Sequence, residues 1–212
     1  LTKHGSSTLF APRVQEHYHS IHGAVQESMH VFIQAGLQAL PPDKHEISIL
    51  EMGLGTGLNA LLTLLHAGER RIAYTGVEAY PLKPEQVAAL NYPQALGGED
   101  ARQAFLRIHE LPWGSPQPLA PDFTLTKVEA DFLAFNPETT FDLLFFDAFA
   151  PNVQPDLWSD EALARLFPML NPGGIFSTYS AKSSVRKGLI KAGFRVEKLE
   201  GPPGKREMLR AH

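Results

Sequence analysis

The stretch ILEMGLGTGLNALLTLL, residues 49–65, joins an apolar run to a helix-like run through three alternating glycines, Gly53, Gly55 and Gly57. EISILEMG predicts a buried strand, and GLNALLTLLHAG predicts a helix that ends at Gly68. A glycine-rich turn between a strand and a helix lets backbone N–H groups approach a ligand closely. The stretch therefore predicts a nucleotide-like ligand at the carboxyl edge of a parallel sheet.

Strands and helices alternate through the rest of the chain, which predicts an α/β fold with a doubly wound, mostly parallel sheet. Seven strands are expected, at 46–53, 71–81, 123–132, 141–151, 173–180, 194–201 and 206–211. Only PPGK separates the last two, so they must pair as an antiparallel hairpin at one edge of the sheet.

The N-terminal part predicts a short hairpin or irregular lead-in at 11–28, followed by a helix over 27–40 that the two prolines at 41 and 42 end. We therefore divide the chain into an extension, 1–40, that packs on a core domain, 41–212. Further helices are expected at 57–68, 83–92, 101–110, 155–170 and 181–193. Residues 94–121 contain no other recognisable motif; Trp113 could stack on a base or anchor its loop.

Composition limits the class of protein. The chain has 212 residues, 43% of them hydrophobic, and no cysteine, which excludes disulfide scaffolding and thiolate catalysis. No apolar run is long enough for a membrane span and no signal peptide is evident, so a cytoplasmic protein without a membrane partner is expected. The histidines at 17, 19, 22 and 30 lack carboxylates at matched spacing, so no metal is expected.

Charge is distributed unevenly along the chain. Residues 182–212 carry nine basic and three acidic side chains, a net +6, whereas the preceding residues carry ten basic and twenty acidic, a net −10. A positive end on an acidic body indicates a phosphate-binding face, although solvated helix surfaces would give the same count.

The glycine turn by itself leaves the ligand ambiguous, because Gly55-x-Gly57-x-x-Ala60 also satisfies the loose dinucleotide pattern. Two features favour S-adenosylmethionine (SAM). Glu51 with the three glycines gives E-x-G-x-G-x-G, the usual first motif of SAM methyltransferases, and their version of the Rossmann-like fold ends in an antiparallel hairpin. Glu78 ends the second strand, where a carboxylate either accepts both ribose hydroxyls or is simply solvated.

Two aspartates follow later strands. Asp131 could accept a hydrogen bond from an adenine amino group or cap its own turn. Asp147, in FFDAFAP, could take the proton of an alkylamine or orient the neutral amine, with Phe149 facing a base or a developing cation. Its apolar neighbours would exclude water and strengthen a carboxylate hydrogen bond. The alternative is an aspartate that caps the next turn beside a core phenylalanine.

Several segments together resemble the family of tRNA wobble-uridine aminomethyl methyltransferases, whose members are the methyltransferase half of bifunctional bacterial MnmC and a stand-alone form. The segments are ESMHVFI, EMGLGTGLN, VEAYPL, FFDAFAPNVQPDLWS, NPGGIFSTYSAKSSVRKGLIKAGF and GPPGKREML. The resemblance runs from about Glu27 to Arg210 and implies a Rossmann-like class I fold. It also implies methyl transfer from SAM to the amine of 5-aminomethyl-(2-thio)uridine in tRNA, giving the 5-methylaminomethyl nucleoside.

The resemblance assigns roles to individual residues. The SAM-binding positions are Glu51, Gly53, Gly55, Thr56, Gly57, Asn59, Glu78, Asp131 and Asp147. The catalytic positions are Asp147 and Phe149. The expected contacts with the tRNA anticodon stem-loop are Lys182, Arg186, Lys205, Arg206 and Glu207. Since the chain stops at His212, the flavin-dependent half is expected to be absent, and neither a flavin nor an obligate protein partner is expected.

Three other functions stay open from the sequence. The fold also suits a small-molecule amine methyltransferase or an aminopropyl transferase, against which the positive C-terminal end argues. A nicotinamide-dependent oxidoreductase would use the same glycine pattern. A non-catalytic RNA-binding module could have kept the fold without affinity for SAM.

Overall fold

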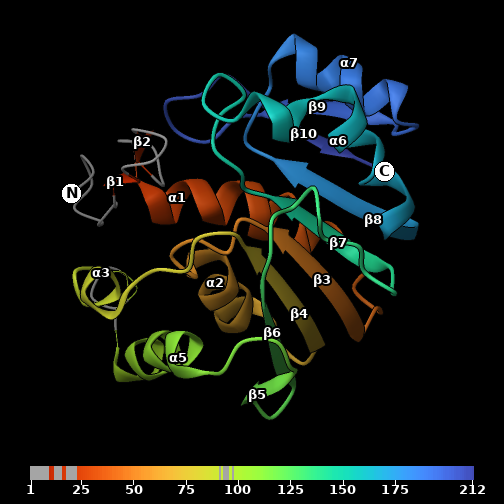
Figure 1. Cartoon of the computed structure of the whole chain (residues 1–212). Helices are drawn as coiled ribbons and strands as arrows, with labels where there is room; N and C mark the ends of the chain where they lie inside the picture. The colour runs from red at the N-terminus through yellow and green to blue at the C-terminus, as the bar shows by residue number, and fades with distance from the viewer. Residues whose placement is uncertain (1–9, 12–15, 18–22, 91, 93–95, 97) are drawn as a thin grey trace.

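The computed structural model describes residues 10–11, 16–17, 23–90, 92, 96 and 98–212. Its centre is an eight-stranded sheet in the order β5-β6-β4-β3-β7-β8-β10-β9 (Figure 1). In that order the strands are β5 (Gln117–Ala120), β6 (Phe123–Glu129), β4 (Arg71–Glu78), β3 (Glu46–Met52), β7 (Phe141–Phe146), β8 (Leu170–Thr178), β10 (Glu207–Ala211) and β9 (Val196–Glu200). The α/β class predicted from the sequence is confirmed.

The five central strands β6, β4, β3, β7 and β8 pair in parallel, while β10 is antiparallel to both β8 and β9. The predicted C-terminal hairpin is therefore confirmed. The predicted count of seven strands is wrong, because β5 adds an antiparallel edge to β6. The sequence pattern did not predict β5, because the strand is only four residues long and contains Pro118, which is accommodated in an edge strand.

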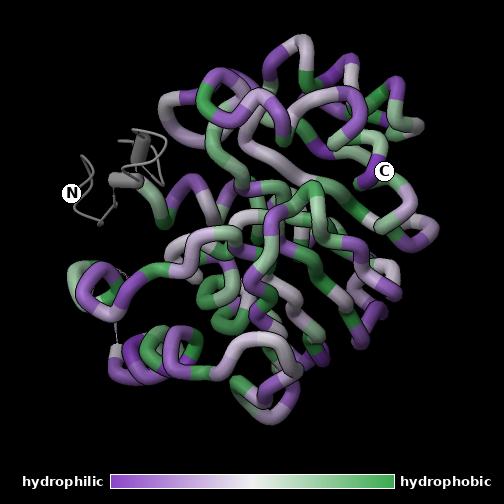
Figure 2. Tube along the Cα trace, in the orientation of Figure 1, coloured by the Kyte–Doolittle hydropathy of each residue, from purple (hydrophilic) through white to green (hydrophobic). Residues whose placement is uncertain are grey.

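Helices cover both faces of the sheet. One face carries α1 (Ala24–Ser28), the π-helical turn η1 (Met29–Gln34), η2 (Leu37–Ala39), α2 (Leu58–His66), α3 (Pro84–Ala88) and α5 (Glu99–Glu110). The other carries η3 (Pro155–Trp158), α6 (Asp160–Ala164), η4 (Phe167–Met169) and α7 (Ser183–Lys191). Each face has its own apolar cluster. Figure 2 shows apolar segments concentrated in the interior, with more hydrophilic residues toward the outer loops.

Two predicted helices are interrupted. The expected helix over 155–170 is divided into three short helices, η3, α6 and η4. Ser159 caps the N-terminus of α6, because its hydroxyl accepts a hydrogen bond from the Ala162 N–H. Pro168 lies in the 3₁₀ turn η4 that follows. The expected helix over 27–40 changes from α to π to 3₁₀ geometry along its length. Propensity alone does not register such breaks, which arise from local capping and packing.

The N-terminal segment reaches the core of the sheet. Phe32 is 1% exposed, and its ring centroid lies 5.2 Å from that of Phe145 in β7. Before it, β1 (Phe10–Ala11) and β2 (Glu16–His17) pair antiparallel as the sequence suggested, whereas Tyr18, His19 and His22 lie outside the described residues. The division at residue 40 stays a prediction.

The helices are short for a bilayer. In the part of the chain that the structure describes, no helix is both long enough and apolar enough to cross a membrane.

Truncating Phe32 tests whether the N-terminal helix is part of the folded core. We expect Phe32→Ala to lower the free energy of unfolding by about 3–5 kcal/mol, because it removes a buried aromatic ring and leaves a cavity against β7. Urea denaturation followed by circular dichroism measures the change. The control Ile190→Ala, at a side chain that is 48% exposed, should stay within about 0.5 kcal/mol. Equal, small effects of both substitutions would contradict the packing described.

Candidate active site

The glycine turn after β3 lies directly against the end of β7. Gly53, Gly55 and Gly57 have φ of 91°, 50° and 71°, values that side chains strain to adopt. A Cβ atom on Gly53 would lie 2.8 Å from the backbone oxygen of Asp147. Glycine at 53 is therefore required both by the turn and by this contact, which brings the turn and Asp147 together.

The side-chain amide of Asn59, in the first turn of α2, links two carboxylates. Its Nδ2 donates to Glu51 Oε1 at 2.7 Å and to Asp147 Oδ2 at 2.9 Å. Glu51 is fully buried and also accepts from the hydroxyl of Tyr74 at 2.8 Å. Burial, followed by the charge of Asp147, raises the pKa of Glu51 well above its ordinary value. Glu51 thus supports Asn59 from beneath the turn, and its predicted role in binding SAM stays a prediction.

Asp147 is partly exposed at the carboxyl edge of the sheet, as predicted for the residue after β7. Burial raises its pKa to about 7, and the charge of Glu27 adds to the rise; the Asn59 hydrogen bond and the positive charge of Lys205 oppose it. A carboxyl group with this pKa can both receive and release a proton near neutral pH. Phe149, two residues on, is partly exposed, and its backbone oxygen accepts from the indole of Trp158.

Lys205, a predicted tRNA contact, is paired with an acidic side chain in the structure. Its Nζ donates to Glu27 Oε1 at 2.6 Å and lies 4.0 Å from the ring centroid of Tyr179. The Tyr179 hydroxyl donates to the backbone oxygen of Ala148, next to Asp147. The folded chain thus pairs Lys205 with a buried glutamate, and its predicted contact with tRNA stays a prediction. Glu27, from α1, was given no role by the sequence, because its partner is 178 residues away.

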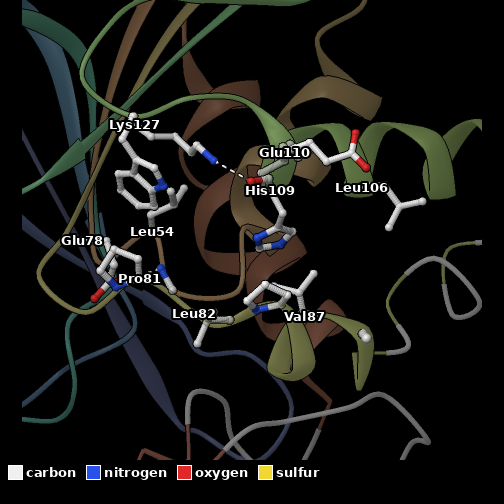
Figure 3. Close-up of a pocket in the computed structure, with 14 residues that line it drawn as sticks. Leu54, Glu78, Pro81, Leu82, Val87, Leu106, His109, Glu110 and Lys127 are labelled. Carbon is white, nitrogen blue, oxygen red and sulfur yellow. Dashed lines mark hydrogen bonds between the residues drawn. The ribbon is translucent and has the colours of Figure 1, made fainter.

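Glu78 lies at the end of β4, on the other side of the glycine turn. Its two carboxylate oxygens accept from the backbone N–H groups of Gly55 and Tyr80, both at 2.8 Å. Gly55 and Glu78 line a pocket of about 350 Å³ whose walls include Leu54, His109, Trp113 and Lys127 (Figure 3). Its volume falls within the range of small-molecule sites.

Lys127 and His109 are pocket residues that the sequence analysis missed. Lys127 is 2% exposed; its Nζ donates to the backbone oxygen of His109 at 3.0 Å and lies 4.9 Å from the ring centroid of Trp113. Burial lowers the pKa of Lys127 to about 8 and that of His109 to about 4. Strand alternation could have found Lys127, because it shares a face with the buried Phe123 and Leu125.

The remaining predicted cofactor residues have distinct surroundings. Thr56 is buried in the turn, and its backbone oxygen is 3.2 Å from His109 Nε2. Asp131 is exposed and its Oδ1 accepts from the Leu133 N–H at 2.8 Å, so it caps its own turn, which was the alternative interpretation. Contact of Asp131 with an adenine amino group remains a prediction.

The basic C-terminal residues divide into two groups. Four are ion-paired with acidic side chains: Lys191 with Asp160, Lys198 with Glu207, Lys205 with Glu27 and Arg210 with Glu197. Glu207 is thus paired with Lys198, and its contact with tRNA stays a prediction. Within the described residues the other five have no ion pair: Lys182, Arg186, Lys187, Arg195 and Arg206.

Comparisons with known proteins agree with the arrangement. Residues 121–212 match a family described as S-adenosyl-L-methionine-dependent methyltransferase. The chain is 31% identical to the tRNA 5-methylaminomethyl-2-thiouridine biosynthesis bifunctional protein MnmC of Delftia acidovorans, over 96% of this chain and 33% of that protein. The MnmC protein of Methylibium petroleiphilum is 32% identical, over 93% of this chain and 32% of its own length.

A solved structure is also similar. MnmC2 from Aquifex aeolicus superposes with a TM-score of 0.81 at 26% identity, covering 99% of this chain and 68% of that chain. The chain thus spans about one third of the length of the curated relatives it matches.

The raised pKa of Asp147 has a measurable effect on stability. The shift from 3.8 to about 7 means that the folded protein binds this proton more tightly than the unfolded chain. The stabilisation is complete below pH 3.8 and is lost as the pH rises through about 7. Asp147→Asn removes the ionisable group, so its stability relative to the wild type should rise by ~2 kcal/mol between pH 5 and pH 8. Urea unfolding at both values measures it, and a pH-independent difference would contradict the shift.

Proposed function

We propose that the chain methylates tRNA, because it is similar to S-adenosyl-L-methionine-dependent methyltransferases and to MnmC proteins. The acceptor is the primary amine of 5-aminomethyl-(2-thio)uridine at the wobble position, and the product is the 5-methylaminomethyl nucleoside. The observation that carries the proposal is the position of Asp147, whose carboxylate is held 2.9 Å from Asn59 directly beside the glycine turn. The reaction belongs in the cytoplasm, where tRNA is modified.

The residues around the glycine turn fit SAM. The positive-φ glycines leave room for a ligand to approach the backbone, and Glu78 lies where it can accept the ribose hydroxyls once its hydrogen bond to the Gly55 N–H is exchanged. SAM supplies a methyl group on a positively charged sulfur, which is already an activated leaving group. The protein therefore has to supply mainly position and an unprotonated nucleophile.

Asp147 deprotonates the acceptor amine. An alkylamine is largely protonated near pH 7 and has no free lone pair in that state. Asp147, with a pKa of about 7, takes one proton from the bound ammonium. The nitrogen lone pair then forms the new N–C bond while the C–S bond breaks and its electron pair returns to sulfur. Asn59 keeps the carboxylate aligned during the transfer.

The tRNA approaches from the edge that carries Lys182, Arg186 and Arg206, which form no ion pair with any other described residue. Lys182 is tied to Asn152, which follows Asp147 in the same loop, at 3.2 Å. Arg206 is exposed and directly follows Lys205, which contacts Glu27 and Tyr179. Phosphate contacts by these two side chains would position the anticodon loop without reading its sequence. Arg186 lies in α7, and its positive charge contributes, after the larger effect of Lys198, to lowering the pKa of Glu207.

The proposal is tested with labelled SAM and tRNA bearing 5-aminomethyluridine or its 2-thio form, followed by mass spectrometry of the nucleosides. We expect the 5-methylaminomethyl nucleoside from the wild type. Asp147→Ala should lower turnover at least ~100-fold, the usual size of a lost acid–base contribution, while SAM binding measured by calorimetry persists. Methylation of free amines in place of tRNA, or turnover near the wild-type rate in Asp147→Ala, would contradict the proposal.

The salt dependence of tRNA binding tests the cationic edge. The double variant Lys182→Ala, Arg206→Ala should flatten the slope of log Kd against log salt by about 1–2, because fewer counterions are released from the phosphates. The matched control, Lys191→Ala with Lys198→Ala, removes the same charge from residues that are already ion-paired. Identical slopes for both double variants would show that only net charge attracts the tRNA.

A further inference from the structure

A second carboxylate, Glu27, lies next to Asp147 and is not used by the mechanism above. It comes from α1 on the N-terminal segment, whereas Asp147 follows β7. Printed contacts connect the two: Lys205 Nζ donates to Glu27 Oε1 at 2.6 Å and lies 4.0 Å from the ring centroid of Tyr179. The Tyr179 hydroxyl donates to the backbone oxygen of Ala148, the residue after Asp147, and the charge of Glu27 also raises the pKa of Asp147. Two carboxylates at one site repel each other, so a cation between them lowers the free energy of both.

The free oxygen of Glu27 is the observation that points to a ligand. The Glu27 side chain is only 10% exposed, and Lys205 bonds its Oε1 alone. Among the described residues, Oε2 is buried and has no hydrogen-bond partner. A carboxylate oxygen that is buried without a donor loses its hydration and gains no hydrogen bond in return. Such an atom is stabilised when a bound molecule brings a donor to it.

Lys205 orients the Glu27 carboxylate through Oε1 but provides no donor for Oε2. Its Nζ is held between Glu27 and the ring of Tyr179, whose hydroxyl bonds Ala148. The lysine, the tyrosine and the loop after β7 therefore make a rigid support. Lys205 also prevents the two carboxylates from accumulating an uncompensated double negative charge, because it acts on Asp147 as well.

Glu27 belongs to the elements around Asp147 that would receive the acceptor amine, not to those that would hold the methyl donor. Asn59, from the glycine turn and α2, contacts Asp147 where the proposed methyl donor binds. Glu27 and Lys205 reach Asp147 from other elements, α1 and the turn before β10. The exposed Arg206 adjoins this second group. A primary ammonium delivered by tRNA would thus meet Glu27 and Asp147 together.

Resting on the proposed function, we propose that Glu27 is a second ligand of the acceptor amine. Its Oε2 accepts one N–H of the aminomethyl group while Asp147 removes another proton, and Lys205 holds Glu27 in place. Glu27 therefore determines selectivity for wobble uridines that carry the amine. An unmodified uridine offers no donor to Oε2 and adds no cation to the one that Lys205 already provides.

Binding measurements with matched tRNAs test the inference without relying on turnover. Dissociation constants are measured in the presence of S-adenosylhomocysteine for tRNA with 5-aminomethyluridine and for the same tRNA with unmodified uridine. We expect the wild type to prefer the aminomethyl tRNA. Glu27→Gln should reduce that preference at least ~10-fold, the effect of losing one charge-assisted hydrogen bond, with little change for the unmodified tRNA. The control Glu197→Gln, at a carboxylate paired with Arg210, should keep the preference.

A second variant and a second pair of ligands separate amine recognition by Glu27 from a role in folding or in donor binding. Glu27→Asp keeps the charge but withdraws it by one methylene, so it should also reduce the preference, and urea unfolding verifies that both variants fold. A preference unchanged in both folded variants would overturn the inference. So would a selective loss of S-adenosylhomocysteine binding with retained 5′-methylthioadenosine binding, because Glu27 would then serve the amino group of the donor. Wild-type protein that neither prefers nor methylates aminomethyl tRNA would overturn the proposed function itself.

Discussion

The amide of Asn59 holds together the two parts of the site that must meet for the reaction. It donates one hydrogen bond to Glu51 beneath the glycine turn and one to Asp147 at the end of β7. Without a shared donor, two carboxylates this close would repel each other in a low-dielectric environment. The fixed distance between the donor turn and the acceptor carboxylate therefore depends on a neutral side chain that satisfies both.

The same arrangement gives the carboxylates different chemistry. Glu51 is completely enclosed and receives hydrogen bonds from Asn59 and Tyr74, which hold its carboxylate in place. Asp147 keeps one side toward the edge of the sheet, where its pKa of about 7 suits proton transfer. The negative charge of Glu27 raises the pKa of Asp147, and the positive charge of Lys205 lowers it. The difference in burial between Glu51 and Asp147 therefore separates a carboxylate that holds Asn59 from one proposed to accept a proton.

Much of the fold and part of the site could be predicted because they depend on local sequence. Alternating apolar runs indicated the parallel strands, and PPGK required the C-terminal hairpin. Placement of Asp147 and Glu78 at strand ends followed from the same pattern. Counting charge could not show that Lys205 and Glu207 are ion-paired, because Glu27 is remote from Lys205 in the chain and Lys198 meets Glu207 only across the sheet. The edge strand β5 was missed because a short segment with proline carries little periodic signal.

By itself the sequence determined the α/β class, the glycine turn and the positions of the strand-terminal carboxylates, since strand and helix periodicity and positive-φ turns are properties of neighbouring residues. Only the tertiary structure decided that Glu27 and Lys205 meet beside Asp147, that Glu51 is enclosed, and that Lys127 lines a pocket. The physical reason is that charge pairing and desolvation depend on distances in space, which residues far apart in the chain acquire only when the sheet assembles.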